Sequence, residues 1–317
     1  MLMAKTMVTG AAGFIGSNLS QRLLEEGHTV LGIDSFEDFY PRWIKEKNLA
    51  GLKQNPGFKF VEDSLLELDL KYMVKEVDYV FHLAAQSGVR GSFGQFFDIY
   101  VRNNIMATQR LLEASKDSRI KKFIFASSSS VYGNTPVLPA QETGVLMPFS
   151  PYGVTKMASE QLVRVYNNNF GVPSVSLRYF TVYGHGQRPD MAFHKFIKAI
   201  REDKPLTVYG DGKQTREFTC VSDIVQANIL ALSAPAGSVF NVGGGSHRGL
   251  SEVIDMIGSL MKAKPRIDFQ PSQKGDVSDT AADLTHAKET LGYVPQVGLE
   301  QGLLQEIDYI GQLYGDA

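Results

Sequence analysis

Cysteine, net charge and long apolar runs are all scarce in this chain of 317 residues. Its single cysteine, Cys220, excludes an internal disulfide and favours a reducing compartment, so we expect a cytoplasmic protein. A net charge of −2 supplies no basic surface, and we expect no nucleic-acid partner. No apolar run approaches the roughly 18 residues that span a membrane, and Met1-Leu2-Met3-Ala4-Lys5 is too short for a signal peptide. We therefore expect no membrane association.

Histidine is also rare, and His82, His185, His194 and His247 lack the spacing of metal ligands. We therefore predict no metal site. Low-complexity tracts and internal repeats are absent, which excludes repeat architectures. A chain of this length can bury a sizeable core, either as one large α/β unit or as two lobes.

What the chain does contain is a glycine loop close to its start. The apolar run Thr6-Met7-Val8-Thr9 predicts a short buried strand, and Gly10-Ala11-Ala12-Gly13-Phe14-Ile15-Gly16 follows it. Apolar residues then recur at helical spacing up to Leu24, before a helix stop at Gly27. Such a loop lets backbone N–H groups approach a pyrophosphate, which the helix dipole stabilises. A tight strand–helix turn without a ligand is the alternative.

An acidic residue follows at the distance expected for a dinucleotide site. The segment His28–Ile33 predicts a second strand that leads into Asp34, eighteen residues after Gly16. A carboxylate there would accept a hydrogen bond from a ribose 2′-hydroxyl and favour NAD over NADP. A solvated loop aspartate is the alternative, but strand, helix, strand and acid occur in the order of a dinucleotide-binding unit.

Strands and helices alternate up to about residue 180. Further predicted strands are Phe58–Val61, Val77–Leu83, Lys122–Ser127 and Ser174–Phe180, and predicted helices are about Phe93–Ser115 and Tyr152–Phe170. This alternation predicts an α/β fold, a Rossmann-type doubly wound parallel sheet with helices on both faces. Ligands should lie across the carboxyl ends of its strands.

Beyond residue 180, prolines and glycines punctuate shorter elements, which predicts a smaller C-terminal lobe for the substrate. We expect residues 1–180 to form the NAD-binding core. The apolar stretch around Ser238–Val242 should return to its sheet, so that about 220–245 rejoin the core. Residues 181–219 and 246–317 would then form the smaller lobe.

A tyrosine–lysine pair, Tyr152-Gly153-Val154-Thr155-Lys156, indicates the chemistry. Tyrosine is a poor base at neutral pH because its unperturbed pKa is near ~10. A lysine four residues on lies on the same face of a helix, and its charge can favour the phenolate and lower that pKa. An oxidised nicotinamide would add a second positive charge. We therefore predict Tyr152 as the catalytic base, with Lys156 as its partner.

Together these motifs resemble those of the extended short-chain dehydrogenases/reductases, the NAD-dependent sugar-nucleotide epimerases and dehydratases. The resemblance runs from about Lys5 to Tyr309. Besides the features above, its landmarks are Val61-Glu62-Asp63, His82-Leu83-Ala84-Ala85-Gln86, Asn104, Ser127-Ser128-Ser129-Ser130-Val131-Tyr132-Gly133, Arg178-Tyr179-Phe180-Thr181-Val182-Tyr183-Gly184, Tyr209-Gly210-Asp211-Gly212 and Arg216-Glu217-Phe218.

The resemblance implies a set of NAD contacts. Asp63 with Ser64 would contact the adenine, Asn104 would shape the core beside the cofactor, and Lys156 would also hydrogen-bond the nicotinamide ribose. The whole implied set is Gly10, Gly13, Phe14, Ile15, Gly16, Asp34, Asp63, Ser64, Leu83, Ala84, Ala85, Asn104, Tyr152, Lys156 and Tyr179.

The resemblance also implies a UDP-sugar substrate. Ser128 would join Tyr152 in bonding the reacting sugar oxygen, flanked by Ser127 and Ser129; a polar strand end that satisfies backbone groups is the alternative. Thr181 would border the sugar, at a place where relatives commonly have asparagine. Arg216 and Asp276 match positions that hold the diphosphate and ribose of the nucleotide, whereas Lys274 stands where relatives often have arginine.

The serine run narrows the reaction. Dehydratases of this family need an acid and a base beside the reacting hydroxyl, and here Ser128 and Ser129 occupy those places. Decarboxylating relatives usually place a glutamate there as well. Without a carboxylate, oxidation followed by re-reduction is the simplest chemistry left, which indicates an epimerase.

Two loops bear on the sugar. The segments Asp34-Ser35-Phe36-Glu37-Asp38-Phe39-Tyr40 and Gly186-Gln187-Arg188-Pro189-Asp190-Met191-Ala192 are similar to those of UDP-glucuronate 4-epimerases. Arg188 supplies a planar fork suited to a carboxylate or a phosphate. An ordinary loop arginine, or one that serves only the diphosphate, is the alternative. Arg90 can also reach an anion, and a solvated surface position suits it equally well.

We therefore predict a UDP-sugar 4-epimerase that converts UDP-glucuronate to UDP-galacturonate. Tyr152 would take the proton of the 4-hydroxyl while hydride passes to NAD, and after rotation of the 4-keto sugar hydride would return to its other face. The alternatives are a UDP-glucose 4-epimerase, a UDP-glucuronate decarboxylase, and a non-catalytic NAD-binding protein, which would usually lose Tyr152 or Lys156. Relatives dimerise through helices near 93–115 and 152–170, so the resemblance also implies a homodimer.

Overall fold

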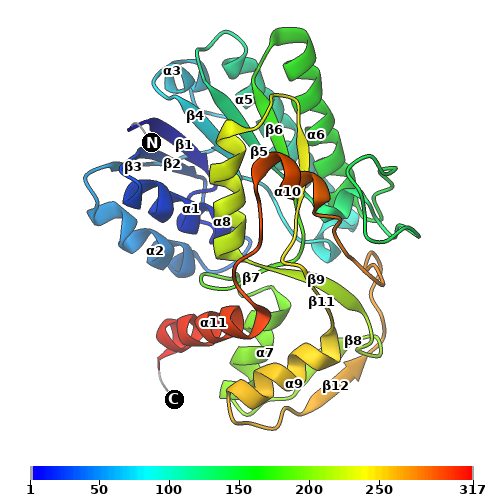
Figure 1. Ribbon diagram of the computed structural model, residues 1–317. Helices are drawn as coiled ribbons and strands as arrows, with labels where there is room; N and C mark the ends of the chain where they lie inside the picture. Colours follow the sequence, from blue (N-terminus) through cyan, green and yellow to red (C-terminus); the bar gives the residue numbers. More distant parts are fainter. Residues whose placement is uncertain (1–2, 316–317) are drawn as a thin grey trace.

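A seven-stranded parallel sheet is the centre of the computed structural model, which describes residues 3–315 (Figure 1). The spatial order of its strands is β10-β6-β5-β4-β1-β2-β3, and every neighbouring pair is parallel. The strands are β1 (Lys5–Thr9), β2 (Thr29–Asp34), β3 (Phe58–Glu62), β4 (Tyr79–His82), β5 (Lys122–Ser128), β6 (Ser174–Tyr179) and β10 (Val239–Val242). The order reverses between β1 and β4, where such folds bind nucleotides. The predicted fold class is confirmed.

Helices cover both faces of this sheet (Figure 1). On one face lie α1 (Phe14–Glu25), α8 (Val221–Leu230) and α10 (Thr285–Leu291); on the other lie α3 (Leu70–Lys75), α5 (Ala107–Ser115) and α6 (Pro151–Phe170). Neighbouring residues of β1 show why the strand is apolar throughout. Val8 packs towards α1 and Met7 towards α3, and both are fully buried.

The second lobe follows β6 and has its own apolar core. Its helices are α7 (Ala192–Arg201), α9 (Leu250–Leu260) and α11 (Leu299–Tyr314). Its strands form a sheet of β7 (Val182–Tyr183), β9 (Thr215–Cys220) and β11 (Ser246–Gly249), and a pair of β8 (Leu206–Tyr209) and β12 (Ile267–Gln270). Figure 1 shows this lobe beyond one end of the main sheet.

The chain passes between the two lobes more than once. The returning segment predicted near residues 238–242 is β10, which pairs with β6 in the main sheet. Conversely, Tyr40, just before α2 (Arg42–Ala50), and Ile44, in the first turn of α2, pack into the core of the second lobe. Part of the N-terminal half therefore helps to build the second core, which hydrophobic periodicity did not predict.

The helix predicted over 93–115 is wrong at its start. The structure has 3-10 turns at Arg90–Ser92 and Gly94–Phe96, then α4 (Phe97–Tyr100), a π-helical segment Val101–Met106, and α5. Gly94 has a φ of 82°, which an α-helix cannot accommodate. The π-helical segment, a type common at functional sites, carries Asn104 into the core.

Within residues 3–315 no helix is long and apolar enough to cross a membrane. Over the same range, no three or more His, Cys, Asp or Glu side chains are grouped so that they could hold a metal ion.

Candidate active site

A cavity lies at the carboxyl ends of β1, β2, β4 and β5, where the sheet meets the loop that precedes α7. It brings together most of the residues predicted to contact cofactor or substrate. These are Gly10, Gly13, Phe14, Ile15, Gly16, Asp34, Ser64, Leu83, Ala84, Ala85, Ser127, Tyr152, Lys156, Tyr179 and Arg188.

The glycine turn is packed too closely for side chains. Gly10 has a φ of 74°, and a Cβ on it would lie 2.9 Å from the backbone nitrogen of Ala84. A Cβ on Gly16 would lie 2.1 Å from the carbonyl oxygen of Gly10. Helix α1 begins directly after Gly13 without a side-chain cap, so its first N–H groups face the cavity as donors for an anion. This geometry fits the pyrophosphate of a dinucleotide.

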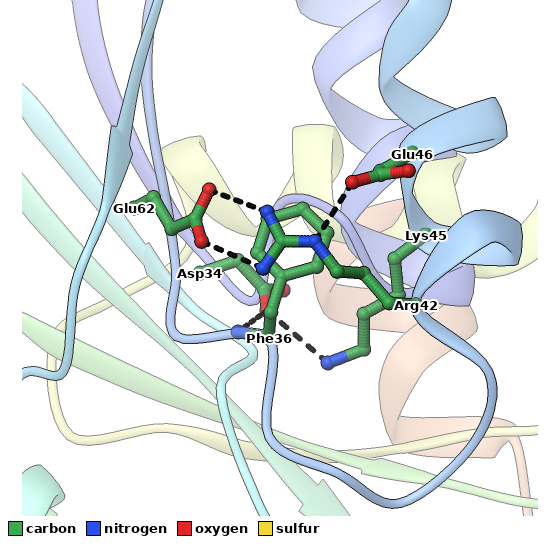
Figure 2. Close-up of polar contacts among 6 residues, drawn as sticks. All are labelled: Asp34, Phe36, Arg42, Lys45, Glu46 and Glu62. Carbon is green, nitrogen blue, oxygen red and sulfur yellow. Dashed lines mark hydrogen bonds and ion pairs between the residues drawn. The ribbon is translucent and has the colours of Figure 1, made fainter.

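Asp34 ends β2 and lines the same cavity. Figure 2 shows the contacts of its carboxylate with Phe36 and Lys45. Its Oδ2 accepts from the backbone N–H of Ala12 at 3.1 Å, and its Oδ1 accepts from that of Phe36 at 2.9 Å. The ammonium of Lys45 lies 3.2 Å from Oδ1. The carboxylate is thus fixed where a ribose hydroxyl would reach it. Sequence reasoning missed Lys45, because no motif links it to Asp34.

Other predicted cofactor residues lie behind the cavity wall. Asn104 is buried; its amide oxygen accepts from the N–H of Gln86 at 2.7 Å, and its amide nitrogen donates to Thr155 Oγ1 at 2.9 Å. It therefore fastens the loop after β4 to α6. Asp63 accepts from the N–H of Ser64 at 2.7 Å, and of these two only Ser64 lines the cavity.

The start of α6 fixes the tyrosine–lysine pair. Ser150 caps the helix by accepting from the N–H of Gly153 at 3.1 Å, and Pro151 occupies the first turn. Tyr152 consequently lies in the first turn and Lys156 one turn on. The Lys156 ammonium is buried, 4.5 Å from the centre of the Phe125 ring.

Burial dominates the electrostatics of this pair. It raises the pKa of the Tyr152 phenol, against the lowering effects of the Ser128 hydroxyl and the Arg188 charge. It lowers the pKa of Lys156 to about 7, against the raising effect of the Glu160 carboxylate. The lowering of the phenol pKa by Lys156 together with an oxidised nicotinamide remains a prediction. The charge of Arg188, which comes from the other lobe, also lowers the pKa of the Tyr152 phenol.

A buried ion pair between Glu160 and Arg178 fixes the helix that carries Tyr152 and Lys156. Glu160 accepts from Arg178 through Oε1–Nη2 at 2.6 Å and Oε2–Nε at 3.1 Å, and from the Ser127 hydroxyl at 2.5 Å. Arg178 also donates to the Tyr132 hydroxyl at 2.7 Å. These bonds tie α6 to β5 and β6. Glu160 follows Lys156 by one helical turn, a spacing that could have indicated it in the sequence.

Arg188 reaches the cavity from the loop between β7 and α7. Its Nε lies 2.9 Å from Oδ1 of Asp190, and its Nη2 lies 3.1 Å from Oδ2. Its guanidinium is 5.7 Å from the centre of the Phe39 ring, which also lines the cavity. The arginine is thus held near Tyr152 by a neighbour two residues along the chain.

The remaining predicted substrate residues lie outside the cavity lining. The Ser128 hydroxyl lowers the pKa of the Tyr152 phenol, and it accepts from the N–H of Ser130 at 3.1 Å. It therefore satisfies a backbone group, and its contact with the sugar stays a prediction. The residues that do not line the cavity are Ser128, Ser129, Thr181, Arg216 and Asp276, together with Asp63 and Asn104.

Arg216 and Asp276 lie in a separate cluster. The Arg216 guanidinium donates to the carbonyl oxygens of Thr215, Val277 and Ser278. Asp276 pairs with Arg90 at 3.2 and 2.6 Å. The Arg90 guanidinium lies 4.1 Å from the centre of the Tyr209 ring in the second lobe. Arg90 therefore bridges the two lobes.

Comparison with known proteins gives the family. Residues 6–243 match the model of the NAD dependent epimerase/dehydratase family. The chain belongs to this family, and the predicted family is confirmed.

Individual relatives are similar over almost their whole length. A crystal structure of UDP-glucuronic acid 4-epimerase from Bacillus cereus, in complex with UDP-glucuronic acid and NAD, is 46% identical with a TM-score of 0.95 and covers 98% of this chain and 100% of its own. The UDP-glucuronate 4-epimerase of Thermodesulfobacterium geofontis (strain OPF15) is 36% identical over 96% of this chain and 95% of its own. The uncharacterized UDP-glucose epimerase YtcB of Bacillus subtilis (strain 168) is 45% identical over 98% of this chain and 99% of its own.

Proposed function

We propose that this protein is an NAD-dependent UDP-glucuronate 4-epimerase. The observation that carries the proposal is that Arg188 lines the same cavity as Tyr152 and Lys156. A guanidinium beside a phenolic base suits a sugar with a carboxylate next to its reacting carbon. The B. cereus relative, solved with UDP-glucuronic acid and NAD, supports the same substrate and cofactor.

The residues of the cavity fit NAD, because the cavity has a tight glycine turn and a fixed carboxylate, that of Asp34. Gly10, Gly13 and Gly16 would hold the pyrophosphate with Phe14 and Ile15, and Asp34 would accept from the ribose. The proposed adenine, groove and nicotinamide contacts are Asp63, Ser64, Leu83, Ala84, Ala85, Asn104 and Tyr179. When bound, NAD supplies an acceptor for the hydride of sugar carbon 4 and later returns it.

Tyr152 acts as the base in this proposal. Its phenolate takes the proton of the 4-hydroxyl, and Ser128, whose hydroxyl lowers the pKa of Tyr152, would share the same sugar oxygen. With a pKa of about 7, Lys156 carries a charge in part of the molecules at neutral pH and would stabilise the phenolate and hydrogen-bond the nicotinamide ribose. Ser127, Ser129 and Thr181 would border the sugar.

Arg188 would hold the sugar carboxylate. Oxidation of carbon 4 in a glucuronate gives a β-keto acid, which loses carbon dioxide when the bond to its carboxyl group aligns with the carbonyl π system. A bidentate guanidinium contact would keep the carboxylate out of that alignment and so protect the intermediate.

The nucleotide would lie towards the second lobe. Arg216 and Asp276 would contact its diphosphate and ribose, and the link through Arg90 and Tyr209 supports a site at this junction. In the proposed division, 1–180 and about 220–245 belong to the NAD-binding core, and 181–219 and 246–317 belong to the nucleotide-sugar-binding lobe. Two segments depart from it, because Tyr40 and Ile44 pack into the second core and α10 packs against the main sheet.

A UDP-glucose 4-epimerase is the second candidate. Asp190 already pairs with Arg188, so the Arg188 guanidinium would remain paired when a neutral sugar binds. The similarity to YtcB also favours this activity. A UDP-glucuronate decarboxylase is less well supported, because Ser128 and Ser129 stand where a carboxylate is expected. The presence of Tyr152 and Lys156 together in the cavity argues against a non-catalytic NAD-binding protein.

A homodimer is part of the proposal. Val154 and Val165 on α6 are exposed by 42% and 47%, and Met106, just before α5, by 49%. Apolar side chains of this kind on neighbouring helices would be covered by a second copy. The single, buried cysteine Cys220 supports a location in the cytoplasm.

Incubation of the purified protein with UDP-glucuronate, UDP-glucose and UDP-N-acetylglucosamine, followed by NMR of the products, tests the assignment. We expect UDP-galacturonate as the main product and slower turnover of the neutral sugars. Faster turnover of UDP-glucose would replace the assignment by the second candidate, and a pentose product with carbon dioxide would indicate the decarboxylase.

A further inference from the structure

A buried cation lies at the ribose end of the cavity, and the proposed reaction has no use for it. Lys45, the fourth residue of α2, is 7% exposed and lines the cavity. Its ammonium lies 3.2 Å from Oδ1 of Asp34 (Figure 2). A lysine is seldom buried unless an anion pairs with it, because its hydration is lost. Here the anion is the carboxylate proposed to accept from the cofactor ribose.

Aromatic rings hold this ammonium in place. The centre of the Tyr40 ring lies 5.3 Å from the Lys45 nitrogen, and that of the Phe36 ring lies 5.7 Å from it. Both distances are within the range of cation–π attraction. Lys45 is therefore fixed by three partners and remains beside the ribose site whether or not Asp34 is charged.

Arg42, a second cation near Asp34, is already paired with carboxylates. Arg42 stacks 4.1 Å above the centre of the Phe36 ring and donates to both oxygens of Glu62, at 2.7 and 2.8 Å (Figure 2). Its Nε donates to Glu46 at 2.7 Å. With two carboxylates around it, this guanidinium is a poor site for a further anion.

We propose that Lys45 is a cofactor-selectivity residue, which holds and neutralises Asp34 for a ribose hydroxyl and binds a 2′-phosphate when the Asp34 charge is removed. A 2′-phosphate carries about 1.5–2 negative charges at neutral pH. In the native protein the 2′-phosphate would lie beside the negative Asp34 carboxylate. Because Lys45 is already paired with that carboxylate, the phosphate would be repelled. Without that carboxylate, a buried and unpaired ammonium would attract it.

The inference concerns cofactor binding and rests only on the NAD part of the proposed function. The test is equilibrium dialysis of nucleotide-free protein with NAD and with NADP. The readout is the ratio of the two affinities in each variant, which a partial loss of folded protein does not change. A failure of the UDP-glucuronate assignment would leave these ratios as they are.

Asp34→Asn should move the ratio towards NADP by about tenfold or more, as expected for one charged hydrogen bond. The double variant Asp34→Asn with Lys45→Met should lose this gain. Lys45→Met alone should move the ratio towards NAD, since Asp34 is then unpaired. If Asp34→Asn does not fold, Asp34→Ser removes the same charge.

The matched control is Lys47→Met. Lys47 lies on the same helix but is exposed, and its ammonium contacts the carbonyl oxygen of Gln312 at 2.6 Å. Its removal changes the net charge equally, and we expect the ratio to stay unchanged. Retention of the NADP gain in the Asp34→Asn, Lys45→Met protein would overturn the proposal. So would loss of that gain in Asp34→Asn with Arg42→Met, because Arg42 would then be the phosphate-binding cation.

Discussion

Asp190 occupies the fork of Arg188 through two hydrogen bonds, Nε to Oδ1 at 2.9 Å and Nη2 to Oδ2 at 3.1 Å. Although burial acts to raise the pKa of Asp190, the Arg188 charge holds it below its ordinary value, so this carboxylate is ionised at neutral pH. An internal carboxylate therefore holds the groups that a sugar carboxylate would use. Binding of a glucuronate requires Arg188 to share or exchange this partner.

Replacement of Asp190 by asparagine should therefore favour the charged substrate. Asparagine keeps one acceptor for Arg188 but removes the competing charge. We expect UDP-glucuronate to bind several-fold more tightly, with little change for UDP-glucose, when calorimetric Kd values are measured in a Tyr152→Phe background. Weaker binding of both nucleotide sugars would mean that Asp190 instead serves to orient Arg188.

Removal of the Arg188 guanidinium should disfavour the charged substrate relative to the neutral one. Loss of one charged, bidentate contact typically removes about 1.5–3 kcal/mol, or roughly ten- to a hundredfold in kcat/KM. Arg188→Ala should thus impair UDP-glucuronate far more than UDP-glucose, with more carbon dioxide and pentose formed per turnover. An equal loss on both substrates would place Arg188 at the diphosphate.

The pair of Glu160 and Arg178 should matter for stability. Both side chains are buried, and Glu160→Gln leaves the Arg178 charge without a carboxylate. Breaking a buried pair in this way costs about 3–5 kcal/mol, which urea unfolding can measure. The control is Glu46→Gln, since Glu46 forms an exposed pair with Arg42 that is expected to contribute under about 1 kcal/mol. Similar losses in the two variants would contradict this difference.

His82 should make the fold sensitive to acid. It is buried between the hydroxyls of Thr9 and Thr108, at 2.8 and 2.9 Å, and burial lowers its pKa to about 3. The unfolded chain binds this proton below about pH 6.5 and the folded chain does not, so stability falls as the pH drops from 6.5 towards 3.

For one such group the slope is about 1.4 kcal/mol per pH unit between the two pKa values. His82→Gln should therefore show a shallower loss of unfolding free energy between pH 6 and 4 than the native chain. Burial also lowers the pKa values of His185 and His194, but the native chain and the His82→Gln variant both contain these histidines. Identical slopes would show that His82 takes up its proton in the folded state.

The elements that could be predicted from the sequence are those defined by local patterns. The glycine turn, Asp34 and the pair of Tyr152 and Lys156 each depend on neighbours within one strand–turn–helix or one helical turn. The cavity does bring them together, at the carboxyl ends of the strands. Their meeting could be predicted because the carboxyl ends of parallel strands lie at one edge of the sheet, whatever the conformation of the connecting loops.

The rest depends on contacts between distant elements. Arg90 meets Asp276 although 186 residues separate them, and nothing local distinguishes this arginine from a solvated one. Lys45 lies on a helix whose start is part of the second core, so its approach to Asp34 follows from the packing of both lobes. The π-helical segment around Asn104 likewise cannot be read from a period of 3.6 residues.

The central claim is that hydrogen leaves sugar carbon 4 and returns to the same carbon on the opposite face. Turnover of UDP-glucuronate deuterated at carbon 4, in ordinary water, tests it most directly by NMR of the product. We expect UDP-galacturonate that keeps its deuterium at carbon 4. Tyr152→Phe should bind the substrate but react about a thousandfold more slowly, since only the proton transfer is lost. Deuterium lost to solvent, or a product unchanged at carbon 4, would contradict the account.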